Sequence, residues 1–521
     1  MMKYYNDPQV WLYKAIFLLI IFSVVVGCSS PQPTAISMEV LPTPALSPIP
    51  SGTITLWPTP LPTDTPLPTA TSTPEPPTPT PTATSTFVPA WHEIKDGDTL
   101  FHMALKYDTS VDEILQMNNL EEDSRLRIGR VLAMPSDITI NLPECHLIED
   151  SEVVNGSTYV DWDTSAFIEK QGGYLAEYEA YGRSAGQIID QVAAKYHVGP
   201  RALLATIEMM SGWVTKKNPS VPTPFGMKGA GTADLQWWTS WAAKKMMQSY
   251  YGQLEGRRDW VVLGSGVQAR LYPGTNPGSA AIVNVLAAVV TDPDKLSTLL
   301  AEKRFQKSYE RLFGEIEAGP VLPADGQQPY FALPWTPGQE WVFTGGPHGG
   351  FGDNITGWAA LDFAPPIPRG CWPSEFPALA VAPGLVIESR KGEVWIDLDE
   401  DGDIRTGWSV YYLHLATEGR IETGERVEVG DVIGFPSCEG GIADASHLHI
   451  ARMYEGQWMP ANGPIPFQLG NWSAKALIGS SYDGRLVNIT GRVLEARPYR
   501  AEGFNVFPTN LYDQVKRTSG Q

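Results

Sequence analysis

Cysteine and basic charge are both scarce in this sequence. Its 521 residues include four cysteines, which is too few for a scaffold built from disulfides. The chain has 38 basic against 58 acidic residues and no basic cluster, which argues against binding nucleic acid or anionic lipid through charge. Only 18% of residues are charged and 43% are apolar, so most of the chain can form a packed core. The length allows about three folded units.

Long apolar runs are lacking too, apart from one near the N-terminus. That run, from Ala15 to Val26, is short for a membrane span and typical of the apolar region of a signal peptide. It leads into Gly27-Cys28-Ser29-Ser30, which resembles a bacterial lipoprotein signal. The resemblance implies a signal peptide at residues 1–27, lipidation of Cys28 and an extracytoplasmic protein anchored to the cell membrane. The alternative is an ordinary signal anchor with an incidental cysteine.

Residues 28–90 consist largely of Pro, Thr, Ser and Ala. Such a segment cannot bury apolar area, so we expect a disordered, extended tether. At about 3 Å per residue it could reach on the order of 150–190 Å from the membrane. That reach suits a target in a thick outer layer such as a cell wall.

Residues 91–136 have the pattern of a small βααβ unit. Strands are predicted over 91–95 and 126–135, and helices after Gly97 and over Ser110–Asn118. Four phrases occur in the order of a LysM module, which the segment resembles: Gly97-Asp98-Thr99-Leu100, Asn118-Asn119-Leu120, Ile128-Gly129 and Leu132-Ala133-Met134-Pro135. The resemblance implies binding to N-acetylglucosamine chains of peptidoglycan or chitin. The alternative is a βααβ unit without a sugar site.

Residues 150–320 are predicted to form a helical domain. Ile188, Val192 and Tyr196 recur at helical spacing, and Pro200 opens the next helix where its missing N–H costs nothing. The run 198–213 resembles lysozyme-like lytic transglycosylases, in which the acid glutamate directly precedes a Ser-Gly pair.

Met210 stands at that acid position here, and Glu208 lies about 200° around the helix from it. We therefore expect an inactive, lysozyme-like domain. A glycan groove and simple core packing both remain open as roles for its tryptophans, Trp213, Trp237, Trp238 and Trp241.

Residues 330–490 switch to short alternating runs with frequent Gly and Pro, typical of an all-β domain of antiparallel strands. Four of the eight histidines fall between His348 and His449. His447 and His449, two apart on a predicted strand, can reach one centre, and Tyr412 and His414 are expected to share a face of another strand. With a carboxylate, such histidines suit a catalytic Zn²⁺ with three protein ligands and one open position. Residues 491–521 are expected to form a C-terminal tail, so the whole chain is predicted to be a multidomain α+β protein.

The order Asp362, Tyr412-x-His414-Leu415, His447-x-His449 resembles the zinc peptidoglycan endopeptidases of the lysostaphin and β-lytic type. In the commoner branch, the first ligand precedes the aspartate by four residues, where this chain has Trp358, which cannot bind zinc. In the β-lytic and staphylolysin branch, that ligand comes from a Gly-Gly-x-His segment, which residues 345–348 match.

The resemblance therefore implies three zinc ligands, His348, Asp362 and His449. It also implies attack of a zinc-activated water on a peptide carbonyl, with His447 taking the proton and His414 stabilising the oxyanion. The alternative is that His348 is a loop residue and the domain binds without cutting.

Two smaller features lie in the same region. Cys371 and Cys438 could form a disulfide near the site; the alternative, thiolate zinc ligands, is disfavoured because the histidines and aspartate already complete a set. The acidic run Asp397–Asp403 begins like a calcium loop. At the twelfth position, however, Trp408 replaces the glutamate of an EF-hand, which favours a hairpin turn.

These patterns together predict a surface-anchored, Zn²⁺-dependent metalloendopeptidase. Its partners would be peptidoglycan, through glycan at the LysM module and peptide at the β domain, and the membrane, through the lipid. The alternative is a non-catalytic peptidoglycan-binding lipoprotein that regulates other wall hydrolases, which the departures at Trp358 and Met210 keep open. Glycan cleavage by the helical domain would need an acid that the sequence does not supply.

Overall fold

The computed structural model describes residues 89–510, apart from 122–125, 127, 139, 228–232, 316–318, 352–353 and 478. The predicted signal peptide, Cys28 and the tether up to residue 88 lie outside the described residues. Within the described ranges, no helix combines the length and the apolar character needed to cross a membrane.

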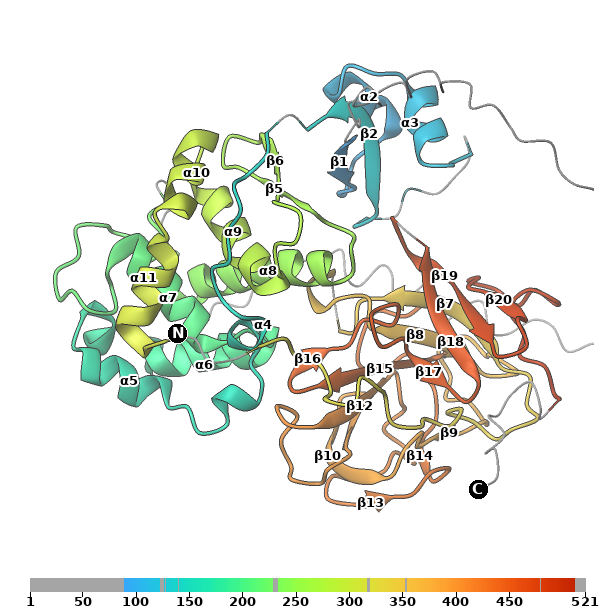
Figure 1. Ribbon diagram of the computed structural model, residues 1–521. Coiled ribbons are helices and arrows are strands. Elements are labelled where there is room, and N and C mark those ends of the chain that lie inside the picture. The colour runs from blue at the N-terminus through green and yellow to red at the C-terminus, as the bar shows by residue number, and fades with distance from the viewer. Residues whose placement is uncertain are drawn as a thin grey trace, which may run out of the picture. The chain divides into compact units, whose positions relative to one another are not determined.

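The N-terminal described unit has the predicted βααβ order (Figure 1). Its elements are β1 (Pro89–Glu93), α2 (Leu100–Lys106), α3 (Val111–Met117) and β2 (Val131–Asp137), and the two strands pair antiparallel. Both helices start where the sequence provides a cap. The Thr99 side chain accepts a hydrogen bond from the His102 N–H, and Ser110 forms a capping box with Glu113.

The helical region follows, in green to yellow in Figure 1. Its helices are α4 (Asp150–Val153), η1 (Ser157–Tyr159), α5 (Thr164–Gln171), η2 (Tyr174–Glu177), α6 (Ala185–Tyr196), α7 (Pro200–Ser211), α8 (Leu235–Leu254), α9 (Pro277–Val289), α10 (Pro293–Ala301) and α11 (Arg304–Phe313). Two short hairpins accompany them, β3 (Glu179–Ala180) with β4 (Arg183–Ser184) and β5 (Trp260–Val262) with β6 (Gln268–Arg270). As predicted, Pro200 is the first residue of α7, and Ile188 and Val192 are buried on one face of α6.

The C-terminal region is built from antiparallel strands, as predicted. The strands of its main sheet are β7 (Val342–His348), β8 (Ala360–Ala364), β10 (Gly384–Arg390), β11 (Glu393–Asp397), β12 (Trp408–Leu413), β13 (Arg426–Val427), β15 (Leu448–Tyr454) and β16 (Gln457–Trp458). They run in the order β13-β10-β11-β12-β15-β8-β7, with β16 paired to β15. Smaller sheets consist of β9 (Ala378–Leu379) with β14 (Val432–Gly434), and of β17 (Gln468–Leu469), β18 (Trp472–Leu477), β19 (Ser480–Asn488) and β20 (Val493–Glu495). A 3₁₀ turn, η3 (Asn354–Thr356), lies between β7 and β8.

The main sheet is buried on both faces at its centre, since every residue of β12 is buried. Val410 and Tyr412 face the core of the β region, whereas Tyr411 and Leu413 belong to a second core that also contains helical residues. Hydrogen bonds join the helical residues to the β region there. The Trp458 N–H donates to the Tyr251 hydroxyl over 3.0 Å, and the Trp358 N–H donates to the Glu255 carboxylate.

The described part of the predicted tail, residues 491–510, packs with the β region. β20 pairs with β19, Val506 bridges Val342, and Phe507 is buried in the β core. These pairings involve three residues or fewer, so they leave no periodic pattern for the sequence to reveal.

Candidate metal centre

Three neighbouring strands bring the three predicted ligands together. His348 is the last residue of β7, Asp362 lies in β8 and His449 lies in β15, directly opposite Asp362 in the register. β7 reaches this point through irregularities in its pairing with β8 on either side of Gly345. A side chain on Gly345 would approach the Asp362 carboxylate, and one on Gly346, whose φ is +132°, would collide with β8. The glycines therefore allow β7 to bend and present His348.

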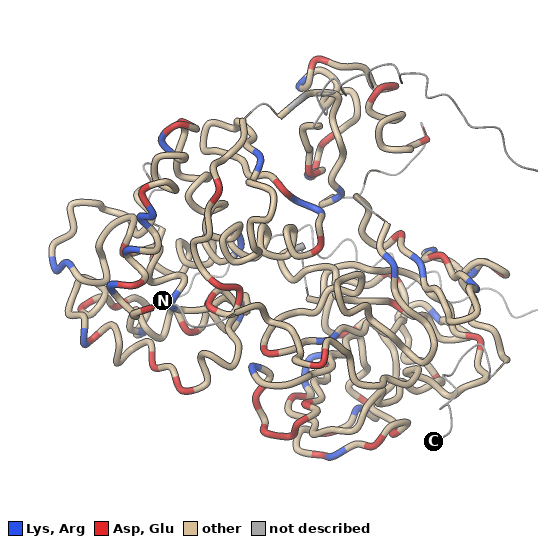
Figure 2. The backbone as a smooth tube through the Cα atoms, in the orientation of Figure 1, with Lys and Arg blue, Asp and Glu red and all other residues tan. Residues whose placement is uncertain are grey.

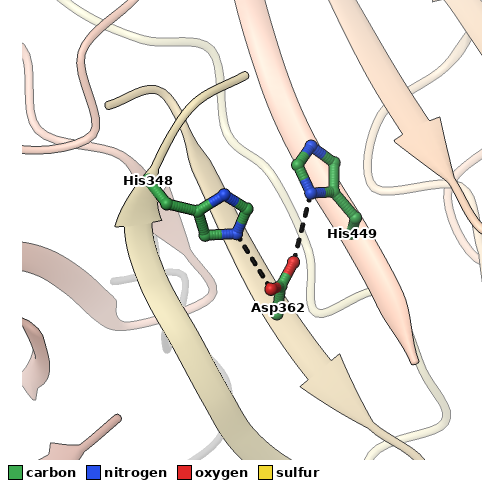
Figure 3. Close-up of side chains that lie close together, drawn as sticks. All are labelled: His348, Asp362 and His449. Carbon is green, nitrogen blue, oxygen red and sulfur yellow. Dashed lines mark ion pairs between the residues drawn. The ribbon is translucent and has the colours of Figure 1, made fainter. Parts of the chain in front are cut away.

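The carboxylate of Asp362 lies between the two imidazoles (Figure 3). His348 Nε2 is 2.9 Å from Asp362 Oδ2, and His449 Nδ1 is 3.1 Å from Asp362 Oδ1. All three side chains are buried, and their ligand atoms lie within 4.8 Å of one another. Tetrahedral zinc sites with an open position use three such nitrogen and oxygen donors.

Backbone carbonyls determine which ring nitrogens face the carboxylate. His348 Nδ1 is 3.1 Å from the Gly349 oxygen, and His449 Nε2 is 2.8 Å from the Gly350 oxygen. Because a carbonyl only accepts, these nitrogens carry the protons, and in the neutral rings the lone pairs of the others point at Asp362. Among the described residues, His348 Nε2 and Asp362 Oδ1 are buried without a hydrogen-bond partner. Lone pairs that face one another in a buried site fit a cation between them, so the donor set fits zinc.

The electrostatics of Asp362 are consistent with this arrangement. Burial alone would raise the pKa of Asp362, but the neighbouring imidazoles of His348, His447 and His449 outweigh that effect and hold the pKa well below its usual range. Asp362 is therefore ionised at neutral pH, as a carboxylate that holds a metal must be.

His414 and His447 lie beside this set, with their ring centroids 4.5 Å apart. His447 Nε2 is 3.8 Å from Asp362 Oδ1, as expected for two histidines spaced His-x-His. His414 directly follows β12 and has a φ of +67°, and its carbonyl accepts hydrogen bonds from the backbone and hydroxyl of Ser437. Left-handed backbone at a non-glycine residue is uncommon and often marks a functional position.

That backbone conformation overturns the predicted pairing of Tyr412 and His414 on one strand face. Tyr412 points into the β core, where its hydroxyl accepts a hydrogen bond from the Val381 N–H at 2.9 Å. The strand ends at Leu413, so its alternation does not extend to His414.

Backbone carbonyls also fix the tautomers of this second pair. His414 Nδ1 is 2.9 Å from the Glu439 oxygen, and His447 Nδ1 is 2.8 Å from the Ala445 oxygen, so both neutral rings present the lone pair of Nε2. Burial, together with the neighbouring His447 and His449, lowers the pKa of His414 to about 3. In this geometry, neutral His414 is a proton acceptor; it can donate to an oxyanion, the role implied by the resemblance, only after it gains a proton.

A cavity of about 740 Å³ opens onto these side chains. The four histidines and Asp362 line it, and exposed apolar residues, including Ile442, border it. Two loops of the cavity region are joined by a disulfide between Cys371 and Cys438, whose Cα atoms are 5.1 Å apart. The Ser446 hydroxyl, next to His447, donates to the carbonyl of Gly370, the neighbour of Cys371.

Tyr482 completes the site, although no sequence pattern identifies it. Its ring stacks on His348 with centroids 4.1 Å apart and planes at 11°. The residue lies in β19, which belongs to another sheet, and nothing in Ser480-Ser481-Tyr482-Asp483 resembles a metal or catalytic motif. Its φ of +70° is unusual for a non-glycine residue, and the sequence alone does not reveal it.

The stack leads to a testable expectation for Tyr482. Tyr482→Ala removes the surface against which His348 packs, so we expect weaker zinc retention, whereas Tyr482→Phe keeps the ring and should retain zinc like the wild type. Zinc content after dialysis, measured by mass spectrometry of the metal, compares the two variants. Equal zinc loss in both would show that the stacking does not hold the ligand.

Trp358, which occupies the ligand position of the commoner branch, contacts helical residues through its backbone N–H and its ring. Its backbone N–H donates to Glu255, its ring lies 4.4 Å from the Arg257 guanidinium, and its side chain is buried. Tryptophan at position 358 therefore does not disturb the arrangement of His348, Asp362 and His449.

The helical residues singled out by the sequence have mainly structural contacts. Glu208 is buried and accepts hydrogen bonds from Thr215 and Arg311, and Met210 is half-buried. Trp213 and Trp238 belong to the core, Trp241 packs against it, and Trp237 is half-exposed. The core role therefore applies to most of these tryptophans.

Two regions of the chain match known domain families, and the chain is also similar to a protease. Residues 92–135 match the LysM domain, and residues 146–325 match the family described as LasA, N-terminal domain. Protease LasA of Pseudomonas aeruginosa is 22% identical over 315 residues, covering 56% of this chain and 71% of that protein.

Among solved structures, the chain is similar to the M23 metalloprotease pseudoalterin from the deep sea, at 19% sequence identity and a TM-score of 0.25. The match covers 33% of this chain and 99% of pseudoalterin. The chain is also similar to the catalytic domain of lysostaphin from Staphylococcus simulans, with 22% identity, 24% and 89% covered, and a TM-score of 0.18. The chain therefore contains a LysM domain and is homologous to a protease. The helical region matches a LasA domain, and its lysozyme-like fold stays a prediction.

Proposed function

We propose that this protein is a zinc-dependent endopeptidase that hydrolyses peptide stems or cross-links of peptidoglycan. The observation that supports it most is the buried convergence of His348, Asp362 and His449, with lone pairs facing one another beside an open cavity. The similarity to Protease LasA and the LysM match support the same reaction class and the same polymer.

The three ligands would hold Zn²⁺, which when bound supplies a Lewis acid that polarises a peptide carbonyl and acidifies water. His447 Nε2 presents a lone pair at the edge of the ligand set and takes the proton of the attacking water. His414 lies against His447 and is also an acceptor in its neutral form. A proton gained there would turn His414 into a donor toward the developing oxyanion or the leaving amine.

Attachment and targeting would come from the N-terminal segments. We propose that a lipid on Cys28 anchors the protein outside the cytoplasm, that the tether spans to the wall, and that the LysM domain holds glycan while the β region cuts peptide. The similarity to Protease LasA and the LysM match support an extracytoplasmic location.

The anchor has its own test. Cys28→Ser should abolish incorporation of labelled fatty acid, because the substitution removes the thiol that would carry the lipid. Serine at position 29 or 30 mutated to alanine provides the matched control and should leave labelling unchanged. Labelling that survives in Cys28→Ser would rule out the lipoprotein assignment.

Digestion of purified peptidoglycan by the zinc-loaded protein tests the reaction. We expect newly exposed amino groups, because peptide hydrolysis creates amino termini and glycan cleavage does not. Binding to the wall without any release of amino groups would instead favour the non-catalytic regulator.

A further inference from the structure

The loop between β11 and β12 gathers three carboxylates at one point. It covers residues 398–407, and the antiparallel pairing of the two strands makes it the hairpin connection that the sequence favoured. Side-chain oxygens of Asp397, Asp399 and Asp401 nevertheless lie within 4.8 Å of one another. Acidic clusters are common at protein surfaces, so the environment of each carboxylate is what indicates whether this cluster binds an ion.

Asp397 is the informative member, because it is wholly buried. Its Oδ2 accepts a hydrogen bond of 2.8 Å from the Gly402 N–H, whereas its Oδ1 is shielded from water and has no hydrogen-bond partner among the described residues. A buried carboxylate oxygen without a partner is costly. Burial and the charges of Asp399 and Asp401 together raise the pKa of Asp397 to about 7, even though the Gly402 contact lowers it.

The basic side chains of the loop do not neutralise the cluster. Arg405 forms its ion pair with Asp403, and Arg426 forms one with Glu400. Within the described chain, no ion pair reaches Asp397, Asp399 or Asp401, so three carboxylates share one small space and none has a basic ion-pair partner.

The backbone of the loop is shaped around these carboxylates. Gly402 has a φ of +87°, which brings its N–H onto Asp397. A side chain on Gly407 would overlap the Asp399 carboxylate, so Asp399 folds back over the end of the loop. The Asp401 oxygens are oriented by the Asp403 N–H and the Thr406 hydroxyl. The spacing Asp-x-Asp-x-Asp-Gly is that of the first six positions of a calcium loop.

We propose that the carboxylates of Asp397, Asp399 and Asp401 bind a calcium ion. Calcium prefers carboxylate oxygens at about 2.3–2.6 Å, so ligands on opposite sides of it stand about 4.6–5.2 Å apart, and oxygens that all lie within 4.8 Å of one another can surround it. With Trp408 in place of a bidentate glutamate, water completes the shell, and we expect a dissociation constant of about 10⁻⁴–10⁻³ M, as in extracellular modules.

Calcium at this position would stabilise the hairpin whose second strand leads to the active-site region. β12 runs from the loop to Leu413, and His414 follows directly. Arg405, inside the loop, also donates a hydrogen bond to the carbonyl of Tyr159 in the helical region. The proposed calcium site shares no residue with the proposed zinc ligands, so a protein that does not bind calcium here could still be the proposed peptidase.

Terbium luminescence on the full zinc-loaded chain tests the site. Trp395 and Trp408 lie in the strands that the loop joins and can sensitise bound Tb³⁺. The protein is freed of calcium with a resin at pH 7.5 instead of a soluble chelator, so that zinc stays bound. We expect saturable Tb³⁺ emission that Ca²⁺ displaces, and at least about tenfold weaker Ca²⁺ competition in Asp399→Asn, which loses one charged ligand.

Glu400→Gln is the matched control, because it removes the neighbouring charge from a residue outside the cluster. It should compete like the wild type. Absence of saturable emission in the wild type, as expected if a proton shared by Asp397 and Asp399 relieves the repulsion, would overturn the proposal. Equal weakening in both variants would also overturn it, since the loop would then respond only to net charge.

Discussion

Replacing His348 with alanine is expected to remove zinc and abolish wall hydrolysis. The substitution leaves two of the three proposed ligands and also takes away the imidazole 2.9 Å from the buried Asp362 carboxylate. Metal analysis of the purified full chain should give one zinc per molecule in the wild type and little or none in His348→Ala. Release of amino groups from peptidoglycan should fall to the level of the blank.

His146→Ala is a suitable control for this experiment. His146 is exposed in the helical region, where it pairs with Glu149, so its loss changes neither ligands nor cavity. Zinc content and hydrolysis should match the wild type. A His348→Ala protein that keeps full zinc occupancy and activity would show that the ligand set is wrong, and the folded state of both variants can be compared by circular dichroism.

His447→Ala should separate catalysis from metal binding. Its Nε2 is 3.8 Å from Asp362 Oδ1, outside the trio of converging ligand atoms, so zinc should remain. Loss of a general acid or base typically costs about 10²–10⁴-fold in rate. We expect a rate loss in that range, one zinc per molecule, and unchanged sedimentation with peptidoglycan through the LysM domain.

Several outcomes of the His447 experiment would argue against this role. A variant that loses zinc together with activity would make His447 a ligand. A variant that keeps its rate would move the proton-accepting role to His414, whose Nε2 also presents a lone pair. His146→Ala again serves as the histidine control.

The parts of the molecule that the sequence predicted well are those specified by local signals. Thr99 and Ser110 cap the two LysM helices, and Pro200 begins α7 where its geometry is favourable. His348 could be proposed as a ligand because residues 345–348 match the Gly-Gly-x-His segment of the β-lytic branch, and the structure shows β7 bending at these glycines.

The features that the sequence did not reveal depend on contacts between distant segments. Tyr482 reaches His348 from a different sheet, and Phe507 enters the β core from a segment without strand periodicity. The prediction that Tyr412 and His414 share one face of a strand fails because His414 adopts a left-handed backbone conformation. The tautomer of His414, which governs its chemistry, is fixed by the carbonyl of Glu439, far along the chain.

Mass spectrometry of peptidoglycan fragments tests the central claim most directly. Walls are digested with the zinc-loaded wild type and, in parallel, with His447→Ala. We expect fragments with new amino termini in peptide stems or bridges from the wild type, and a loss of them with the variant. Fragments ending in anhydro-sugars, or no fragments from a wild type that holds zinc and binds the wall, would contradict it.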